Sequence, residues 1–188
     1  LVAGEGGTLD GELAQAPDRR PRIVFLPALI REISPAHDLL ALLELANFFI
    51  SEKPQVVHTH SSKAGILGRL AAWAAGVPVV IHTYHGFGFS DHQPRWLKSL
   101  YVLIERLCCA LSSCLIFVSR SNWEYAMRHE LGKSEKYVLI RSGVKLSDFP
   151  PTGFARENAG AKKASLGLRM HKPLVISVGN LKPQKNPG

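Results

Sequence analysis

Two segments of the sequence combine histidines with hydroxyl groups in a similar order. The first is VVHTHSSKAG, residues 56–65, and the second is VVIHTYHG, residues 79–86. Each places two histidines at the end of an apolar run. Imidazole can bind a metal ion, exchange a proton, or donate a hydrogen bond to a sugar hydroxyl. The surrounding residues discriminate between these chemistries.

A metal site is the first alternative. His58 and His60 stand two residues apart, so in a strand they share one face, as two zinc ligands would. Zinc needs three or four ligands, and no Cys, Asp or Glu stands within a few residues of either pair. We therefore expect no metal, and a zinc enzyme stays a minor alternative. We expect His58 and His82, inside their strands, to be satisfied by backbone hydrogen bonds.

A binding pocket is the favoured alternative. His60 and His85 come where a strand passes into a loop or helix, and such positions favour ligand contact. His60 is followed by Ser61, Ser62 and Lys63 at the start of a helix. Free N–H groups, the positive helix end, hydroxyls and an ammonium group suit a phosphate or a sugar hydroxyl.

The residues after His85 also favour a ligand. Gly86 and Gly88 allow close approach of the backbone, and Phe87 and Phe89 supply apolar walls. The segment GFGFSD lacks the third glycine of the dinucleotide-binding pattern, so a nicotinamide or flavin cofactor is not indicated.

Apolar runs and helical patterns alternate along the chain and predict an α/β fold. We expect strands at residues 22–26, 55–60, 77–83, 114–119, 136–143 and 173–179, and helices at 35–51, 63–76, 96–112 and 121–132. The strands are continuous apolar runs, which predicts burial on both faces. We therefore predict a Rossmann-like, doubly wound parallel sheet, whose ligands bind beyond the carboxyl ends of the strands. Residues 144–168 are expected to be polar and irregular.

The length and charge of the chain limit the possible classes of function. The 188 residues suit one domain, or one domain and part of a second. The net charge of +8 is spread along the chain, so a nucleic-acid arm is not indicated. A positive charge spread in this way suits anionic ligands or an anionic membrane surface. Three cysteines in an apolar segment and the lack of a signal peptide predict a cytoplasmic protein.

Several segments together resemble glycosyltransferase family 4, a retaining group with the GT-B fold. Residues 56–86 resemble its N-terminal domain, and FVSRSN, residues 117–122, resembles its strand that ends in Val-Ser. KYVLIRSGVKLSDF, residues 136–149, resembles its hinge, and PLVISVGNLKPQKNPG, residues 173–188, resembles the opening of its second domain. The resemblance begins at about residue 23, and its pieces occur in the family's order.

The resemblance implies a domain organisation. Residues 1–170 would form most of the N-terminal, acceptor-side domain, with the boundary falling within about 148–172. Residues 171–188 would begin the C-terminal domain, which binds the nucleotide sugar. The first βα unit of the family would be missing, and we expect the 188-residue chain alone to be inactive.

The resemblance also implies roles for single residues. His85 matches the active-site histidine that points at the donor sugar, and Lys185 matches the lysine at the donor phosphates. Asn180 stands where the family often has Arg, which removes one positive charge near those phosphates. Weaker candidates for the cleft rim or for substrate binding are His60, Ser61, Ser62, Lys63, Gly86, Phe87 and Ser119.

The implied function is transfer of a sugar from a nucleotide-diphosphate sugar to a glycan or lipid-linked acceptor in cell-surface polysaccharide synthesis. No cofactor or metal is expected. Two alternatives stay open: a GT-B-fold epimerase acting on a nucleotide sugar, and a non-catalytic α/β binding module. The basic aromatic sequence at Arg95–Lys98 is compatible with peripheral contact with an anionic membrane, or with an ordinary core helix.

Overall fold

The structure is a computed structural model that describes residues 1–5, 22–89, 93–143, 145–148 and 152–169. The chain forms two compact units, Leu1–Ser142 and Gly143–Gly188. The predicted start of a second domain at residue 171 lies outside the described residues, so that boundary stays a prediction.

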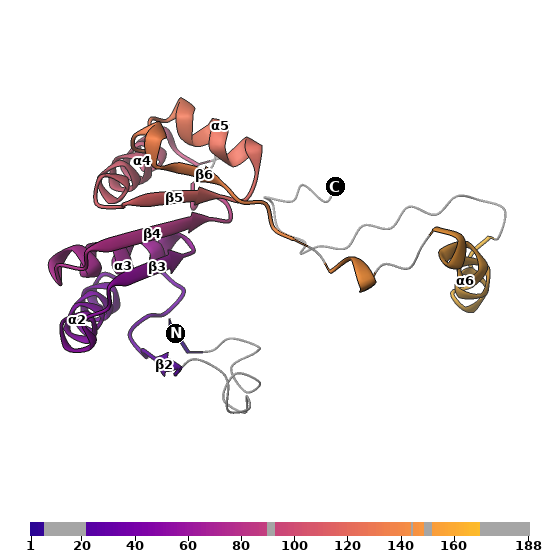
Figure 1. Cartoon of the computed structure of the whole chain (residues 1–188), viewed down its shortest axis with the longest axis horizontal. Helices are drawn as coiled ribbons and strands as arrows, with labels where there is room; N and C mark the ends of the chain where they lie inside the picture. The colour runs from indigo at the N-terminus through magenta and orange to yellow at the C-terminus, as the bar shows by residue number, and fades with distance from the viewer. Residues whose placement is uncertain (6–21, 90–92, 144, 149–151, 170–188) are drawn as a thin grey trace. The chain divides into compact units, whose positions relative to one another are not determined.

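A parallel sheet forms the centre of the first unit (Figure 1). Its strands lie in the order β3-β4-β5-β6, with bounds Val56–His60, Val79–Tyr84, Cys114–Phe117 and Tyr137–Leu139. His60 is paired with Thr83, so the carboxyl ends of β3 and β4 lie side by side. Two short strands, β1 (Val2–Ala3) and β2 (Val24–Phe25), form a separate parallel pair.

Four helices accompany this sheet, and each lies close to a helix expected from the sequence. They are α2 (Pro35–Glu52), α3 (Ser62–Ala74), α4 (Arg95–Ala110) and α5 (Arg120–Arg128). Helix α3 packs on β3 and β4, whereas α5 packs on β5 and β6 (Figure 1). The predicted α/β architecture with a parallel sheet is confirmed.

Local sequence accounts for the start of α2. Pro35 occupies the first turn, where its missing N–H costs no helical hydrogen bond. The Ser34 N–H donates to the carboxylate of Asp38 at 3.2 Å, which satisfies one donor of the helix start. The Ser34 hydroxyl contacts Nδ1 of His37 at 2.9 Å, and its side chain makes no capping bond to the backbone.

The helices pack against one face of the sheet. Side chains from α2 and α3 form a core with Val57 and Val80, and side chains from α4 and α5 form a second core with Leu115 and Phe117. The other face is more open: Val56 is 51% exposed, Val79 37% and Val138 41%. The prediction of strands buried on both faces is therefore wrong for the described residues, because these helices all cover the same side.

The second unit contains a helix that the sequence analysis did not expect. Residues 144–168 were predicted to be irregular, but Thr152–Ser165 form α6 after a short 3₁₀ helix at Leu146–Asp148. The segment lacks a clear apolar stripe, which hid the helix from the pattern. Its last turn carries Lys162 and Lys163, which favour the negative end of the helix dipole. Across the described residues, no helix is long and apolar enough to cross a membrane.

Candidate functional site

Two of the predicted residues meet at the carboxyl edge of the sheet. His60 ends β3, and His85 directly follows β4. Nδ1 of His60 lies 3.1 Å from Nε2 of His85, and both side chains are exposed. A hydrogen bond at this distance requires one ring nitrogen to donate and the other to accept. The two imidazoles therefore form a dyad that fixes the tautomer of each ring relative to the other.

His58 and His82, the other two histidines of these segments, contact threonine hydroxyls. Nδ1 of His82 lies 2.8 Å from Oγ1 of Thr59, and Nε2 of His58 lies 2.8 Å from Oγ1 of Thr83. The prediction of backbone partners is wrong for both, because the paired register of β3 and β4 brings hydroxyls within reach first. The buried position of His82 confirms its structural character.

The turn between β3 and α3 is strained. Ser61 has φ 61° and ψ 167°, a conformation that is essentially confined to glycine. Its side chain makes no capping hydrogen bond, although it occupies the cap position of α3. The next residue, Ser62, lies against the loop after β4, since a Cβ placed on Gly88 would stand 2.8 Å from the Ser62 hydroxyl. This close approach brings the two predicted ligand-binding segments together.

Lys63 anchors the segment that leads into α2. Its ammonium group forms an ion pair with Asp38 and donates to the backbone carbonyl of Glu32. Both side chains of the ion pair are mostly shielded from solvent. Lys63 thus joins the start of α3 to the start of α2, and its charge is already balanced by Asp38.

The loop after β4 is held by aromatic contacts. Phe87 packs on Tyr84 and Tyr125, with ring centroids 5.1 and 4.9 Å apart respectively, and Phe89 is buried. Phe89 therefore belongs to the core and forms no wall of an open pocket. Gly86 has φ 154°, which L side chains rarely adopt, so glycine suits the turn after His85.

Ser119 follows β5 and caps helix α5. Its hydroxyl accepts a hydrogen bond from the Asn122 N–H at 3.2 Å and lies 3.0 Å from the Ser121 hydroxyl. This is the usual way for serine to satisfy an N-terminal amide of a helix. The contacts of Ser119 are thus those of a cap, and its predicted part in substrate binding stays a prediction.

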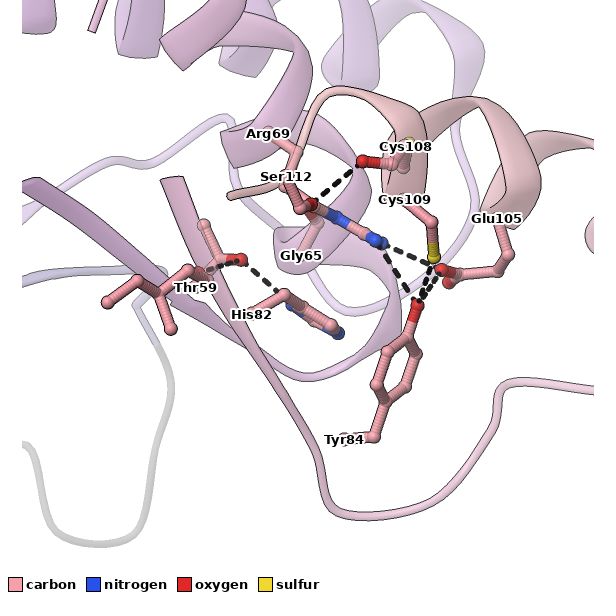
Figure 2. A network of polar contacts seen from close by, with 10 residues as sticks. Thr59, Gly65, Arg69, His82, Tyr84, Glu105, Cys108, Cys109 and Ser112 are labelled. Atoms are coloured by element: carbon pink, nitrogen blue, oxygen red, sulfur yellow. Dashed lines mark hydrogen bonds and ion pairs between the residues drawn. The ribbon is translucent and has the colours of Figure 1, made fainter. Parts of the chain in front are cut away.

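A buried polar network joins α3 and α4 to the end of β4 (Figure 2). Arg69 of α3 pairs with Glu105 of α4, with 2.8 Å between Nη2 and Oε2, and its Nε donates to the Gly65 carbonyl. The Tyr84 hydroxyl donates to Glu105 at 2.7 Å and lies 3.1 Å from Sγ of Cys109. Tyr84 is the residue before His85, so the network fixes the end of β4 that carries the histidine.

The sequence analysis missed this network. The available signal was a charged residue inside each of two apolar helical segments, Arg69 in GILGRLAAW and Glu105 in YVLIERLCC. Buried charges of opposite sign in neighbouring helices usually pair. The pattern alone does not say which helices are neighbours, so the partners could not be named.

Burial and neighbouring charges set the protonation of these groups. Burial, followed by the Arg69 charge, lowers the pKa of His82 from 6.5 to about 2. Burial and the neighbouring imidazoles also lower the pKa values of His58 and His60. For Arg69, burial acts to lower the pKa, but the Glu105 carboxylate outweighs it, so the guanidinium stays charged. His82 is therefore neutral at physiological pH.

The structure leaves other parts of the predicted site untested. Lys185 and Asn180, the expected donor-phosphate residues, lie outside the described residues. Within the part of the chain that the structure describes, no group of three or more His, Cys, Asp or Glu side chains is arranged to hold a metal ion. What the described site offers is a histidine dyad beside a strained turn, at the edge where parallel sheets bind ligands.

A comparison with models of known protein families identifies the family of this chain. The model of the glycosyl transferase 4-like domain matches residues 2–143, which is almost the whole of the first unit. The chain belongs to this glycosyltransferase family. The family expected from the sequence motifs is thereby confirmed.

Curated relatives agree with this assignment. The chain is 37% identical, over all of its length, to an Escherichia coli UDP-Gal:alpha-D-GlcNAc-diphosphoundecaprenol alpha-1,3-galactosyltransferase, and it covers 46% of that protein. It is 28% identical over 113 residues to the capsular polysaccharide biosynthesis glycosyltransferase CapM of Staphylococcus aureus, covering 60% of the chain and 30% of CapM. The chain thus spans less than half of the length of these relatives.

Solved structures share the fold. Anabaena Alr3699/HepE in complex with UDP superimposes with a TM-score of 0.61 over 88% of the chain and 42% of that protein, at 15% identity. A UDP-N-acetylglucosamine 2-epimerase from Rickettsia bellii gives a TM-score of 0.54 over 89% of the chain and 43% of the epimerase, at 17% identity. At such identities the likeness shows the Rossmann-like GT-B fold and does not discriminate transferase from epimerase.

Proposed function

We propose that the full-length protein is a retaining glycosyltransferase of cell-surface polysaccharide synthesis, which moves a hexose from a UDP-sugar to a lipid-diphosphate-linked sugar. The observation that carries the proposal is the 37% identity along the entire chain to a galactosyltransferase of that kind. UDP-galactose carries its sugar in the α configuration, so an alpha-1,3 product means retention. We propose the same stereochemistry for this protein.

The site geometry supports a role for His85 beside the donor sugar. Because His60 holds one of its ring nitrogens, the imidazole is oriented before substrate arrives. A preoriented donor that faces developing charge stabilises a transition state better than one that must reorganise. We assign the donor phosphates to Lys185 and Asn180, and we propose transfer without a metal or other cofactor.

Peripheral contact with an anionic membrane is part of the proposal, and helix α4 supports it. Trp96, Leu100, Leu103 and Leu107 follow one another at helical spacing and are 70%, 46%, 54% and 59% exposed. An apolar stripe of this kind on an amphipathic helix suits the boundary between headgroups and acyl chains. We place the contact at the cytoplasmic face of the membrane.

Basic side chains accompany the stripe. A shallow cavity of about 410 Å³ on α4 is lined by Arg95, Lys98 and Arg106, with His129 from the end of α5. Cationic side chains beside an apolar stripe favour anionic lipid headgroups. The alternative noted from the sequence is an ordinary core helix, and the exposure of four large apolar side chains in one row favours the membrane contact over it.

Vesicle binding tests the membrane contact. We expect the full-length protein to float with vesicles that contain phosphatidylglycerol and not with pure phosphatidylcholine. Leu103→Glu should weaken this binding at least tenfold, whereas Leu40→Glu, at a similarly exposed position of α2, should leave it unchanged. Equal binding to both vesicle types, or equal loss in both variants, would remove the membrane from the proposal.

Enzyme assays test the transferase. The full-length protein should transfer labelled galactose from UDP-galactose to GlcNAc-diphosphoundecaprenol, with an α linkage by NMR and with full activity in the presence of a chelator. His85→Ala should lose most activity without a change in thermal stability. We expect the 188-residue chain alone to show no turnover. Inversion at C2 of UDP-GlcNAc by the full-length protein, without transfer, would instead favour the epimerase.

A further inference from the structure

An apolar pocket is lined in part by residues that closely follow His60 and His85 in the sequence. It has a volume of about 360 Å³, within the usual range of small-molecule sites, and lies between the start of α2, α3 and α4. Its walls are mostly aliphatic, with the ring of Tyr101 added to Ile33, Ile66, Leu67, Leu97, Leu100 and Ile104. Of the lining residues, Ser62, Lys63 and Gly88 had been singled out from the sequence as part of a ligand site.

Three residues of the lining connect the pocket to the predicted ligand-binding segments. They are Ser62, Lys63 and Gly88, which are close in sequence to His60 and His85. The two charged side chains of the lining, Lys63 and Asp38, already form an ion pair. Beyond the Tyr101 and Ser62 hydroxyls and this ion pair, the lining offers few hydrogen-bond partners, so a buried nucleobase or sugar would lose most of its hydrogen bonds to water without replacement. The lining therefore fits a hydrocarbon occupant.

The pocket is continuous with the exposed stripe on α4. Leu100 belongs to both, because it is 46% exposed and also lines the pocket. A chain that leaves a membrane along this stripe can enter the pocket without crossing a polar surface. Two observations thus point to the same kind of occupant, the apolar lining and its connection to a membrane-facing row of side chains.

We infer that this pocket holds the first isoprene units of a lipid-linked acceptor, with the adjoining phosphate at the N-terminal end of α3. The inference rests on the proposed function, because it assigns a place to that acceptor. With the chain seated in the pocket, the sugar beyond the diphosphate extends toward His60 and His85. Burial of the chain removes apolar surface from water, and this supplies affinity that the diphosphate alone does not have.

Binding of farnesyl diphosphate, compared with inorganic diphosphate, tests the pocket without requiring turnover. The full-length protein should bind farnesyl diphosphate at least tenfold more tightly by calorimetry. Ile104→Trp, which fills the pocket, should remove this preference and leave diphosphate binding unchanged. Leu40→Trp, at an exposed position of α2 outside the pocket, should keep it. Ile66→Trp tests the opposite wall in the same way.

Several results would overturn the inference. Equal affinity of the unchanged protein for the two probes is one, and it stands even where a tryptophan variant fails to fold. Equal effects of Ile104→Trp and Leu40→Trp are another. A dimer in sedimentation that only the pocket variants dissociate would show that a second copy occupies the pocket. If farnesyl diphosphate binds as expected but no sugar is transferred, the proposed function fails while the pocket assignment stands.

Discussion

Nδ1 of His60 lies 3.1 Å from Nε2 of His85, so the last residue of β3 and the residue after β4 share one hydrogen bond. The pKa of His60 is lowered by burial, then by the charges of His58 and His85. Removal of one imidazole removes one source of repulsion. The site's protonation is therefore a property of the group of histidines and not of one ring.

His85→Ala should raise the pKa of His60 toward its ordinary value of 6.5, because a neighbouring positive charge can no longer form. His58→Ala should raise it at least as much. NMR titration of the ring protons measures both shifts. His37 is not among the groups that lower the pKa of His60, so His37→Ala serves as the control and should leave the titration of His60 unchanged. A fall in the His60 pKa in either variant would contradict the dyad.

Arg69→Met should destabilise the protein by about 3–5 kcal/mol, because it leaves the buried carboxylate of Glu105 without its cationic partner. Glu105→Leu should cost a comparable amount of stability, because it leaves the buried charge of Arg69 without its partner. Urea unfolding followed by circular dichroism gives the free energy of unfolding. The double variant Arg69→Met/Glu105→Leu should recover much of the loss. Additive losses in the double variant would show that the two charges do not depend on each other.

Acid should destabilise the fold through His82. Its folded-state pKa is about 2, against 6.5 ordinarily, so below pH 6.5 the unfolded chain takes up a proton that the folded chain does not. Stability from this group therefore rises between pH 2 and 6.5 and is constant above. The slope approaches about 1.4 kcal/mol per pH unit.

The His82→Asn variant isolates this contribution. We expect it to be less stable at pH 7, since the Thr59 contact and the packing suffer, but to lose stability less steeply from pH 6.5 to about pH 5. In this variant His58 and His60 still contribute to the dependence of stability on pH. Denaturant titrations at a series of pH values measure that dependence. An unchanged slope in the variant would mean that His82 takes up its proton in the folded state.

Gly65→Ala should destabilise the protein by about 1–3 kcal/mol through overpacking. A Cβ at this position would lie 2.4 Å from Cε1 of the buried His82. His82→Ala removes the obstacle, and in that background Gly65→Ala should gain about 0.5–1 kcal/mol, because alanine favours the helix. Thermal unfolding of the four proteins of this cycle measures the coupling. The same loss in both backgrounds would contradict the close packing of α3 on β4.

Ser61→Gly should stabilise the protein by about 1 kcal/mol or more, since glycine adopts φ 61°, ψ 167° without steric cost. Ser62→Gly is the matched control, because Ser62 is the first residue of α3 and glycine disfavours a helix. It should destabilise by up to about 1 kcal/mol. Thermal unfolding compares the two. A loss of stability in Ser61→Gly would mean that the serine side chain compensates for its backbone strain.

Local sequence determined the elements and their order. Apolar runs, together with Pro35 and the serines before α3, placed the helices and strands to within a few residues, since such signals act over one or two turns. The order of strands and helices, with the motifs in residues 56–86, was enough to predict a parallel sheet and to place the histidines at its carboxyl edge. Helix α6 was not predicted, because its sequence lacks a clear apolar stripe.

Only the tertiary structure decided which groups meet. The register of β3 and β4 made Thr59 and Thr83 the partners of His82 and His58, and no local signal specifies that register. The pairing of Arg69 with Glu105 joins residues 36 positions apart, so it depends on how α3 and α4 pack. The sequence determined which residues could do chemistry, whereas long-range packing decided which of them act together.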